Sequence, residues 1–297
     1  MDKCCTKIFY VVFVVTLTMV NFIANAKLPR IFVSVAPQKL LIQRLAGVSA
    51  QIEILLQPGQ DPHTFEPSSR IITKLANADV YFSIGVPFEM AWMRRIKAVN
   101  PQMNIVNGSD NEDLKFIDEH VNEFSNEHAH EHNHDVDPHT WTSPVLVKAM
   151  SLQWRDYLIG YDPENKDVYL QNYVALSTEL DALDVEIKAM LAPISKSCHF
   201  MVYHPAWGHF ANAYNLIQIS VEQNGKSPGA KTFVSLVNQA KALKLKTVFV
   251  QPQFDRKTVQ TLADAIDAQV EILDPLVEDY FGNLRQVASK IARSCTK

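Results

Sequence analysis

Histidine is the residue type in this sequence with the clearest chemical potential. The chain of 297 residues contains ten histidines, and neutral imidazole combined with a carboxylate suits zinc in a tetrahedral site. Three of them, His63, His139 and His204, stand in short segments that also contain proline, beside expected strands or helices. Strand ends and the loops that follow them are where open α/β sheets bind their ligands.

One carboxylate, Asp274, occupies a comparable position. It directly follows the expected strand 270–273 and precedes a proline, much as His204 ends the expected strand 199–204 and precedes Pro205. Taken singly, each of these residues is explained by a surface turn or a hydrogen-bonded side chain. Four of them, two in each half of the chain, favour a metal site built from His63, His139, His204 and Asp274.

A second group of histidines lies in the acidic segment 109–137, which has no apolar periodicity. We expect this segment to be a surface loop. Its alternating histidines either hold zinc weakly and pass it inward or belong to a solvated acidic loop with no specific task, and we favour weak collection. The histidines concerned are His128, His130, His132 and His134.

The elements that must position these residues alternate between strand and helix, which is the pattern of βαβ units. The first four expected strands are 31–36, 51–56, 79–84 and 103–106, and the second four are 199–204, 217–221, 247–250 and 270–273. We predict an α/β fold with two similar domains, each with a mostly parallel four-stranded sheet flanked by helices.

One long helix is expected to join the two domains rigidly. Apolar residues recur at intervals of three and four from Tyr169 to Met190, which gives one apolar stripe. The same spacing fits a coiled-coil seam, but it extends for only about three heptads, so we predict packing against the domains. The predicted segments are an N-terminal domain at 27–161, the linking helix at 162–192 and a C-terminal domain at 193–297.

The first 26 residues are typical of a secretory signal peptide. Two lysines precede an apolar stretch from 8 to 20, and Ala24-Asn25-Ala26 fits the small-residue cleavage rule, so we predict cleavage after Ala26. The alternative, a retained anchor, is disfavoured because the stretch is shorter than the roughly 20 residues that span a bilayer. The mature chain keeps an excess of acidic residues and no basic patch, which makes nucleic acid an unexpected partner.

Removal of the signal leaves two cysteines, Cys198 and Cys295. Export places them in an oxidising compartment, and we predict that they form a disulfide. Two separate buried thiols are the alternative, because the sequence does not supply the Cα separation that a disulfide requires.

Several motifs together resemble the periplasmic zinc-binding proteins of ATP-binding-cassette zinc uptake systems. The resemblance runs through essentially the whole mature chain and includes the acidic, histidine-rich insertion. The motifs are PGQDPHTFEPS at 58–68, DPHTW at 137–141, YHPAW at 203–207 and LDPL at 273–276.

The resemblance implies that His63, His139 and His204 bind Zn²⁺ in a cleft between the domains, with Asp274, another carboxylate or water as the fourth ligand. It also implies a periplasmic protein that delivers zinc to a membrane permease with a cytoplasmic ATPase, and we expect a monomer that is not an enzyme. The chain departs from the family pattern at Pro205, His209 and Gln251. We expect His209 to pack or hydrogen-bond, and the missing carboxylate at position 251 puts a supporting role there in doubt.

Two alternative functions remain open from the sequence. A related transporter component for manganese or iron is one, although related manganese-binding proteins usually have glutamate where this chain has His204, and imidazole favours zinc. A secreted zinc hydrolase is the other, because three histidines with an open position also describe catalytic zinc. The hydrolase is disfavoured because none of the expected helices carries a His-Glu-x-x-His motif.

Overall fold

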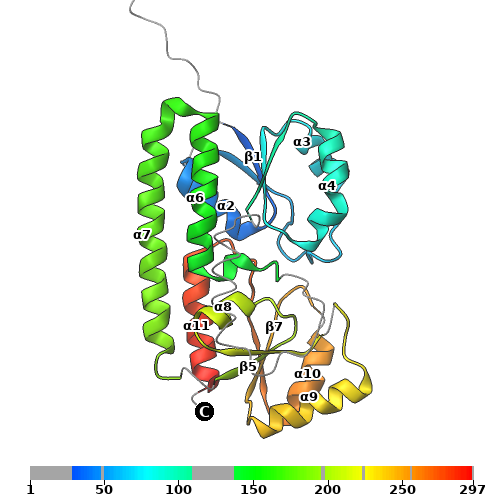
Figure 1. Ribbon diagram of the computed structural model, residues 1–297. Helices are drawn as coiled ribbons and strands as arrows, with labels where there is room; N and C mark the ends of the chain where they lie inside the picture. The colour runs from blue at the N-terminus through cyan, green and yellow to red at the C-terminus, as the bar shows by residue number, and fades with distance from the viewer. Residues whose placement is uncertain are drawn as a thin grey trace, which may run out of the picture.

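The computed structural model describes residues 29–47, 50–108, 137–194, 198–222, 225–254 and 256–295. Figure 1 shows two α/β lobes, one above the other, with long helices along one side. The expected signal peptide at 1–26 and four of the tract histidines, His128, His130, His132 and His134, lie outside the described residues.

The N-terminal lobe is built on a parallel sheet with the strand order β2-β1-β3-β4. Its strands are β1 (Arg30–Val33), β2 (Gln51–Ile54), β3 (Val80–Ser83) and β4 (Asn104–Asn107), and its helices are α2 (Ala36–Ala46), α3 (Ser69–Leu75) and α4 (Pro87–Val99). The central strand β3 is buried along its whole length, as expected for a parallel strand covered on both faces. In Figure 1, α2 lies on one side of the sheet and α3 and α4 on the other.

The C-terminal lobe repeats this plan with the strand order β6-β5-β7-β8, again parallel. Its strands are β5 (His199–Val202), β6 (Ile217–Ser220), β7 (Thr247–Val250) and β8 (Gln269–Ile272), and its helices are α8 (Gly208–Ala213), α9 (Ala230–Ala242), α10 (Arg256–Ile266) and α11 (Tyr280–Cys295). The two sheets confirm the predicted α/β fold with two similar four-stranded halves.

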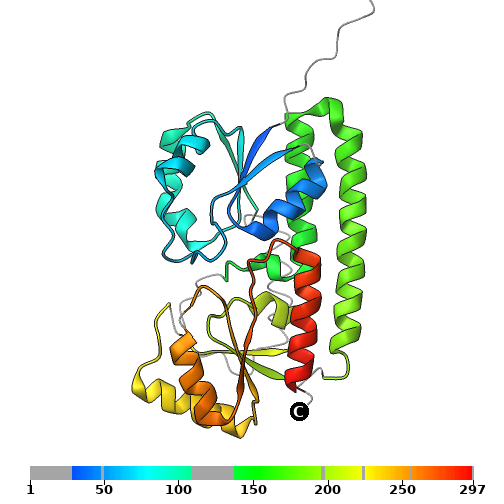
Figure 2. The same ribbon diagram turned by 180° about the vertical axis from the view of Figure 1, so that it is seen from behind.

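Two long helices that pack side by side join the lobes (Figure 2). A 3-10 turn η1 (Thr140–Thr142) leads into α6 (Pro144–Tyr161), and a second 3-10 turn η2 (Pro163–Asn165) leads into α7 (Lys166–Leu191). The predicted linking helix is therefore α7, which begins about one turn after the predicted start at 162 and runs beside both lobes. None of the helices in the described ranges combines the length and the apolar character that crossing a membrane requires.

The apolar stripe of α7 packs into the core, as predicted, and not into a coiled-coil seam. It contacts α6, α2 of the N-terminal lobe and α11 of the C-terminal lobe. One continuous hydrophobic core therefore includes residues of both lobes and of α7. The buried residues of the stripe are Tyr169, Leu176, Leu180, Leu183, Ile187 and Leu191.

The predicted disulfide between Cys198 and Cys295 is present, with the two Cα atoms 5.7 Å apart. It ties the residue before β5 to the last residue of α11. Cys198 is buried, so the bond lies within the packing of the C-terminal lobe, at the opposite end of β5 from His204.

Candidate metal centre

Residues from both lobes meet where strands end. β5 pairs in parallel with β6 and with β7, and when this register is extended past the strand ends, the residues beside His204 are Glu222 and Gln251. His63 reaches the same place from the loop after β2 of the other lobe, and His139 directly precedes η1. The carboxyl ends of the two sheets therefore face a common site, as open α/β folds commonly arrange.

The three predicted imidazoles converge through their Nε2 atoms. The Nε2 of His204 lies 3.4 Å from that of His63 and 3.2 Å from that of His139. Four ligands around zinc at about 2.0–2.1 Å in a tetrahedron are separated by about 3.3 Å, so both distances match a tetrahedral edge. No set of three such side chains in the described ranges already has the full spacing of a metal centre. The two separations that share His204 nevertheless each match the spacing of two nitrogen ligands on one zinc ion.

His204 is held on several sides. Its Nδ1 lies 2.6 Å from Oε1 of Glu222, and because a carboxylate only accepts, Nδ1 carries the proton and Nε2 keeps its lone pair for a metal. Gln251 accepts a hydrogen bond from the backbone N–H of His204 at 3.3 Å and donates one to its carbonyl oxygen at 2.7 Å. The ring of Phe254 stacks on the imidazole with a centroid separation of 5.2 Å.

His139 has an equivalent carboxylate partner. Its Nδ1 donates to Oδ1 of Asp137 at 2.7 Å, which again leaves Nε2 available. Burial alone would raise the pKa of Asp137, but His139 and then His209 outweigh that effect and lower it to about 2. His209 also donates from Nε2 to the carbonyl oxygen of Asp137 at 2.9 Å, which is the hydrogen-bonding role expected for it.

The segment that carries His139 is fixed to the C-terminal lobe, although it follows the N-terminal lobe in sequence. Besides the contact from His209, the indole Nε1 of Trp141 donates to the carbonyl oxygen of Pro275 at 2.8 Å. Trp141 is almost completely buried. His139 and His204 consequently belong to one rigid side of the site.

His63 differs from the other two imidazoles. The residue is exposed, and its backbone N–H, not its ring, hydrogen-bonds to the carboxylate of Asp61 at 2.9 Å. Partial burial of the ring and the nearby His204 lower the pKa of His63 below the usual 6.5, with a smaller opposing effect from Asp61. The ring is therefore neutral at pH 7, as a metal ligand must be.

Asp274 directly precedes Pro275 and Leu276, which line the cavity at the imidazoles. Its Oδ1 accepts hydrogen bonds from the backbone N–H of Leu276 at 2.9 Å and from Nε2 of Gln253 at 3.3 Å. The small cavity at the imidazoles, about 10 Å³, is close to the volume that one water molecule needs, and Asp274 does not line it. The cavity is lined by Pro62, His139, Trp141, His204, Gln251, Gln253, Phe254, Pro275 and Leu276.

Sequence reasoning missed Asp137 and Glu222 as partners of the imidazoles and doubted a role for Gln251. Asp137 was visible in the same motif as His139, and Glu222 shares the strand-end position that singled out His204. At position 251, a side chain that both accepts and donates holds the backbone of His204 from two sides, so the amide has a supporting role that a carboxylate would fill only in part.

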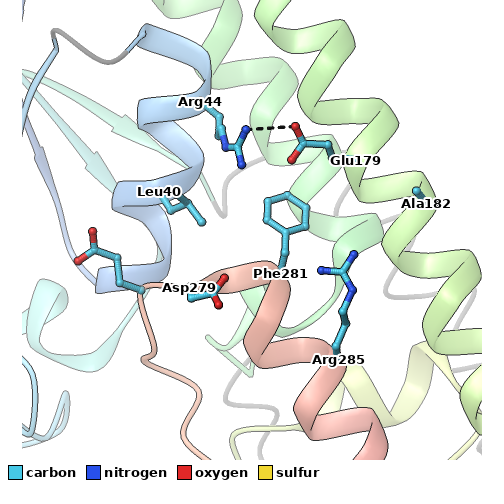
Figure 3. A pocket seen from close by; sticks show the side chains of 8 residues that line it. Leu40, Arg44, Glu179, Ala182, Asp279, Phe281 and Arg285 are labelled. Carbon is cyan, nitrogen blue, oxygen red and sulfur yellow. Dashed lines mark hydrogen bonds and ion pairs between the residues drawn. The ribbon is translucent and has the colours of Figure 1, made fainter.

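A larger hollow, of about 540 Å³, lies away from the imidazoles between α2, α7 and α11 (Figure 3). Arg44 of α2 pairs with Glu179 of α7 at 3.2 Å, and Arg285 of α11 pairs with Glu186 of α7 at 2.7 Å. The ring of Phe281 lies between the two arginines. Although it is the larger space, it has no imidazole or thiol in its lining, so we assign it to the junction of the lobes and not to the metal centre.

Comparison with known proteins finds relatives that are named for metal binding or zinc uptake. A relative from Bacillus subtilis, the high-affinity zinc uptake system protein ZnuA, is 28% identical over 248 residues, which cover 81% of this chain and 76% of the relative. A putative metal-binding protein of Chlamydia muridarum is 27% identical over 269 residues, which cover 89% of this chain and 90% of the relative. Both relatives align over most of their own length.

Solved structures and a family model extend the match. A crystal structure of ZnuA is similar with a TM-score of 0.80 and 34% identity, covering 90% of this chain and 99% of that one. A deletion mutant of ZnuA with zinc bound matches with a TM-score of 0.80 and 33% identity, and the match covers 91% of this chain and 98% of that one. The model of the family described as zinc-uptake complex component A, periplasmic, matches residues 31–294. The chain therefore belongs to the family of periplasmic A components of the zinc-uptake complex.

Proposed function

We propose that this protein captures Zn²⁺ between its lobes through the Nε2 atoms of His63, His139 and His204. The observation that carries the proposal is the pair of Nε2 separations, 3.4 and 3.2 Å, which match a tetrahedral edge for zinc and nitrogen. The zinc-bound structure of a ZnuA variant supports the choice of ion. An all-nitrogen set of three also favours zinc over manganese, which prefers oxygen ligands.

The fourth coordination position belongs to Asp274 or to water. Asp274 would have to give up its hydrogen bonds to Leu276 and Gln253 and turn toward the imidazoles. Water needs no such rearrangement, and the cavity has room for one molecule. A tetrahedral site closed by water would still bind zinc through three protein ligands.

Delivery to a membrane permease completes the proposed role. Residues 1–26 would direct export and be removed after Ala26, and the mature protein would carry zinc as a monomer to a permease driven by a cytoplasmic ATPase. The relative named for high-affinity zinc uptake supports this part of the proposal. The N-terminal sequence and mass of the exported protein would test the cleavage site.

The tract histidines are proposed to collect zinc weakly before it reaches the main site. Alternating imidazoles beside carboxylates supply nitrogen and oxygen ligands for loose binding. Deletion of residues 119–135 is expected to leave one tight zinc site and to abolish weaker binding, as measured by calorimetry. An unchanged stoichiometry would reject the collecting role. The residues concerned are His128, His130, His132 and His134.

A zinc-bound crystal structure with anomalous scattering at the zinc edge tests the main proposal directly. We expect one strong peak within bonding distance of His63, His139 and His204. A peak that lacks any of the three would overturn the ligand assignment. Calorimetry on the three single alanine variants supplies a second test, with tight binding lost or greatly weakened in each.

A further inference from the structure

The two sides of the candidate zinc site are built differently. On one side, the rings of His139 and His204 are buried, and each donates from Nδ1 to a carboxylate, Asp137 or Glu222. These carboxylates fix the tautomer and the ring orientation, so that both Nε2 lone pairs are presented to the same point. The orientation of these two rings is therefore set by the protein itself.

The other side consists of His63 on the loop 57–64. Among the described residues, the hydrogen bonds of this loop stay within the loop and the preceding strand β2, apart from the contact between the His63 and His204 rings. The loop is anchored next to its far end by Phe65, which is buried and packs edge-to-face on Phe88 at a centroid separation of 4.9 Å. His63 therefore sits on an exposed segment with local support only.

We propose that zinc is bound in order: His139 and His204 take the ion first, in the arrangement set by Asp137 and Glu222, and His63 closes the site last and opens it first. The proposal rests on the three-histidine site proposed above. It makes Asp137 and Glu222 positioning residues and makes the loop 57–64 the movable ligand carrier.

The physical reason for the order is that the rings of His139 and His204 are already oriented, whereas the ring of His63 is not. Two rings that are already oriented lose little conformational freedom when they bind an ion. A carboxylate on Nδ1 also makes the imidazole a stronger donor through Nε2. His63 lacks such a carboxylate in the described structure and must order its own loop. Since Pro62, its neighbour, lines the cavity, movement of this loop would open a wall of the site.

Rapid-mixing kinetics on the mature protein can test the order with Zn²⁺ as the probe and tryptophan fluorescence as the signal. Trp141 is a built-in reporter, because its ring lies 5.3 Å from that of His139. The wild type is expected to show a phase whose rate rises with zinc concentration, followed by a phase independent of concentration. His63→Ala should keep the first phase, lose the second and release zinc faster, whereas His139→Ala should lose the first phase.

Glu222 variants test the positioning role without removing a ligand. Glu222→Ala is expected to slow the first phase and to weaken zinc affinity by about 10–100-fold. Glu222→Gln, which can still accept from Nδ1, should recover part of both losses, and a merely structural role would show no such rescue. Glu53→Gln is a matched control. Glu53 is a surface carboxylate of the N-terminal lobe, where it pairs with Lys74, and it does not belong to the lobe that carries Glu222.

The outcomes separate the order of binding from the site itself. If His63→Ala loses the zinc-dependent phase as fully as His139→Ala, the order is wrong while the ligand set stands. If the wild type shows a single phase and both variants slow it equally, the proposed order is again wrong while the ligand set stands. If all three histidine variants keep wild-type affinity, the proposed site itself is wrong. If a histidine variant fails to fold by circular dichroism, the Glu222 pair decides, and wild-type kinetics in Glu222→Ala overturn the proposal.

Discussion

Removal of the disulfide between Cys198 and Cys295 is expected to lower the free energy of unfolding and to leave zinc binding unchanged. The bond joins residues 97 positions apart, and in the chain-entropy model a loop of that length stabilises the folded state by about 4.7 kcal/mol at 25 °C. With an unfolding entropy of about 2.1 cal/mol/K per residue, the corresponding fall in Tm is about 8 °C. Because disulfides typically contribute about 2–4 kcal/mol, the model value is an upper limit.

The assay compares the double variant Cys198→Ala, Cys295→Ala with the wild type by urea unfolding and calorimetry. Reduced wild-type protein is the control, because alanine at the buried Cys198 also leaves a small cavity. Zinc affinity serves as a second readout, since the bond lies at the opposite end of β5 from His204. A loss of stability below about 1 kcal/mol in both reduced and double-variant protein would refute the entropic reasoning, and a large loss of zinc affinity would refute the independence of the site.

Three further outcomes are expected. Asp274→Ala should weaken zinc affinity far less than His204→Ala if water is the fourth ligand, and calorimetry would show comparable losses if Asp274 binds zinc. The pKa of His63 is lower in the folded protein, so near pH 6 the unfolded chain binds more protons than the folded chain. The free energy of unfolding should therefore fall as pH drops below about 6.5. Urea titrations at several pH values should show that His63→Gln removes this part of the pH dependence. Trp141→Phe leaves the carbonyl of Pro275 without its donor and should cost about 1–3 kcal/mol of stability, whereas unchanged unfolding would show that water replaces the indole.

Much of the fold was predictable from the sequence because apolar runs and helical stripes have clear periods. The strand β7 coincides with its predicted range, 247–250. Strand ends were less accurate: the run 199–204 ends as a strand at Val202. Tyr203 still hydrogen-bonds to Phe249 and Glu222, but the backbone of His204 bonds to the side chain of Gln251 instead of to a strand. The predicted range of the linking helix, 162–192, likewise included η2, where Pro163 begins a separate 3-10 turn.

The ligands were predictable for a different reason. His63, His139 and His204 lie in motifs whose prolines and strand-end positions can be read locally. Glu222 could not be assigned to His204 in that way, because their contact depends on the parallel register between β5 and β6. Such a register is a long-range property, set by which strands pair and by the packing of the helices on them.

The length of α7 has a mechanical consequence for metal binding. A helix of 26 residues is about 39 Å long, and a bend of one degree at its middle moves either end by about 0.3 Å. Metal–ligand distances are tolerated only within about 0.2 Å. A bend of this size would therefore shift the lobes by about as much as a metal–ligand distance tolerates, and the loop 57–64 that carries His63 would have to compensate for it. The burial of Leu183 and its neighbours in the stripe therefore limits how far the two lobes can tilt relative to one another.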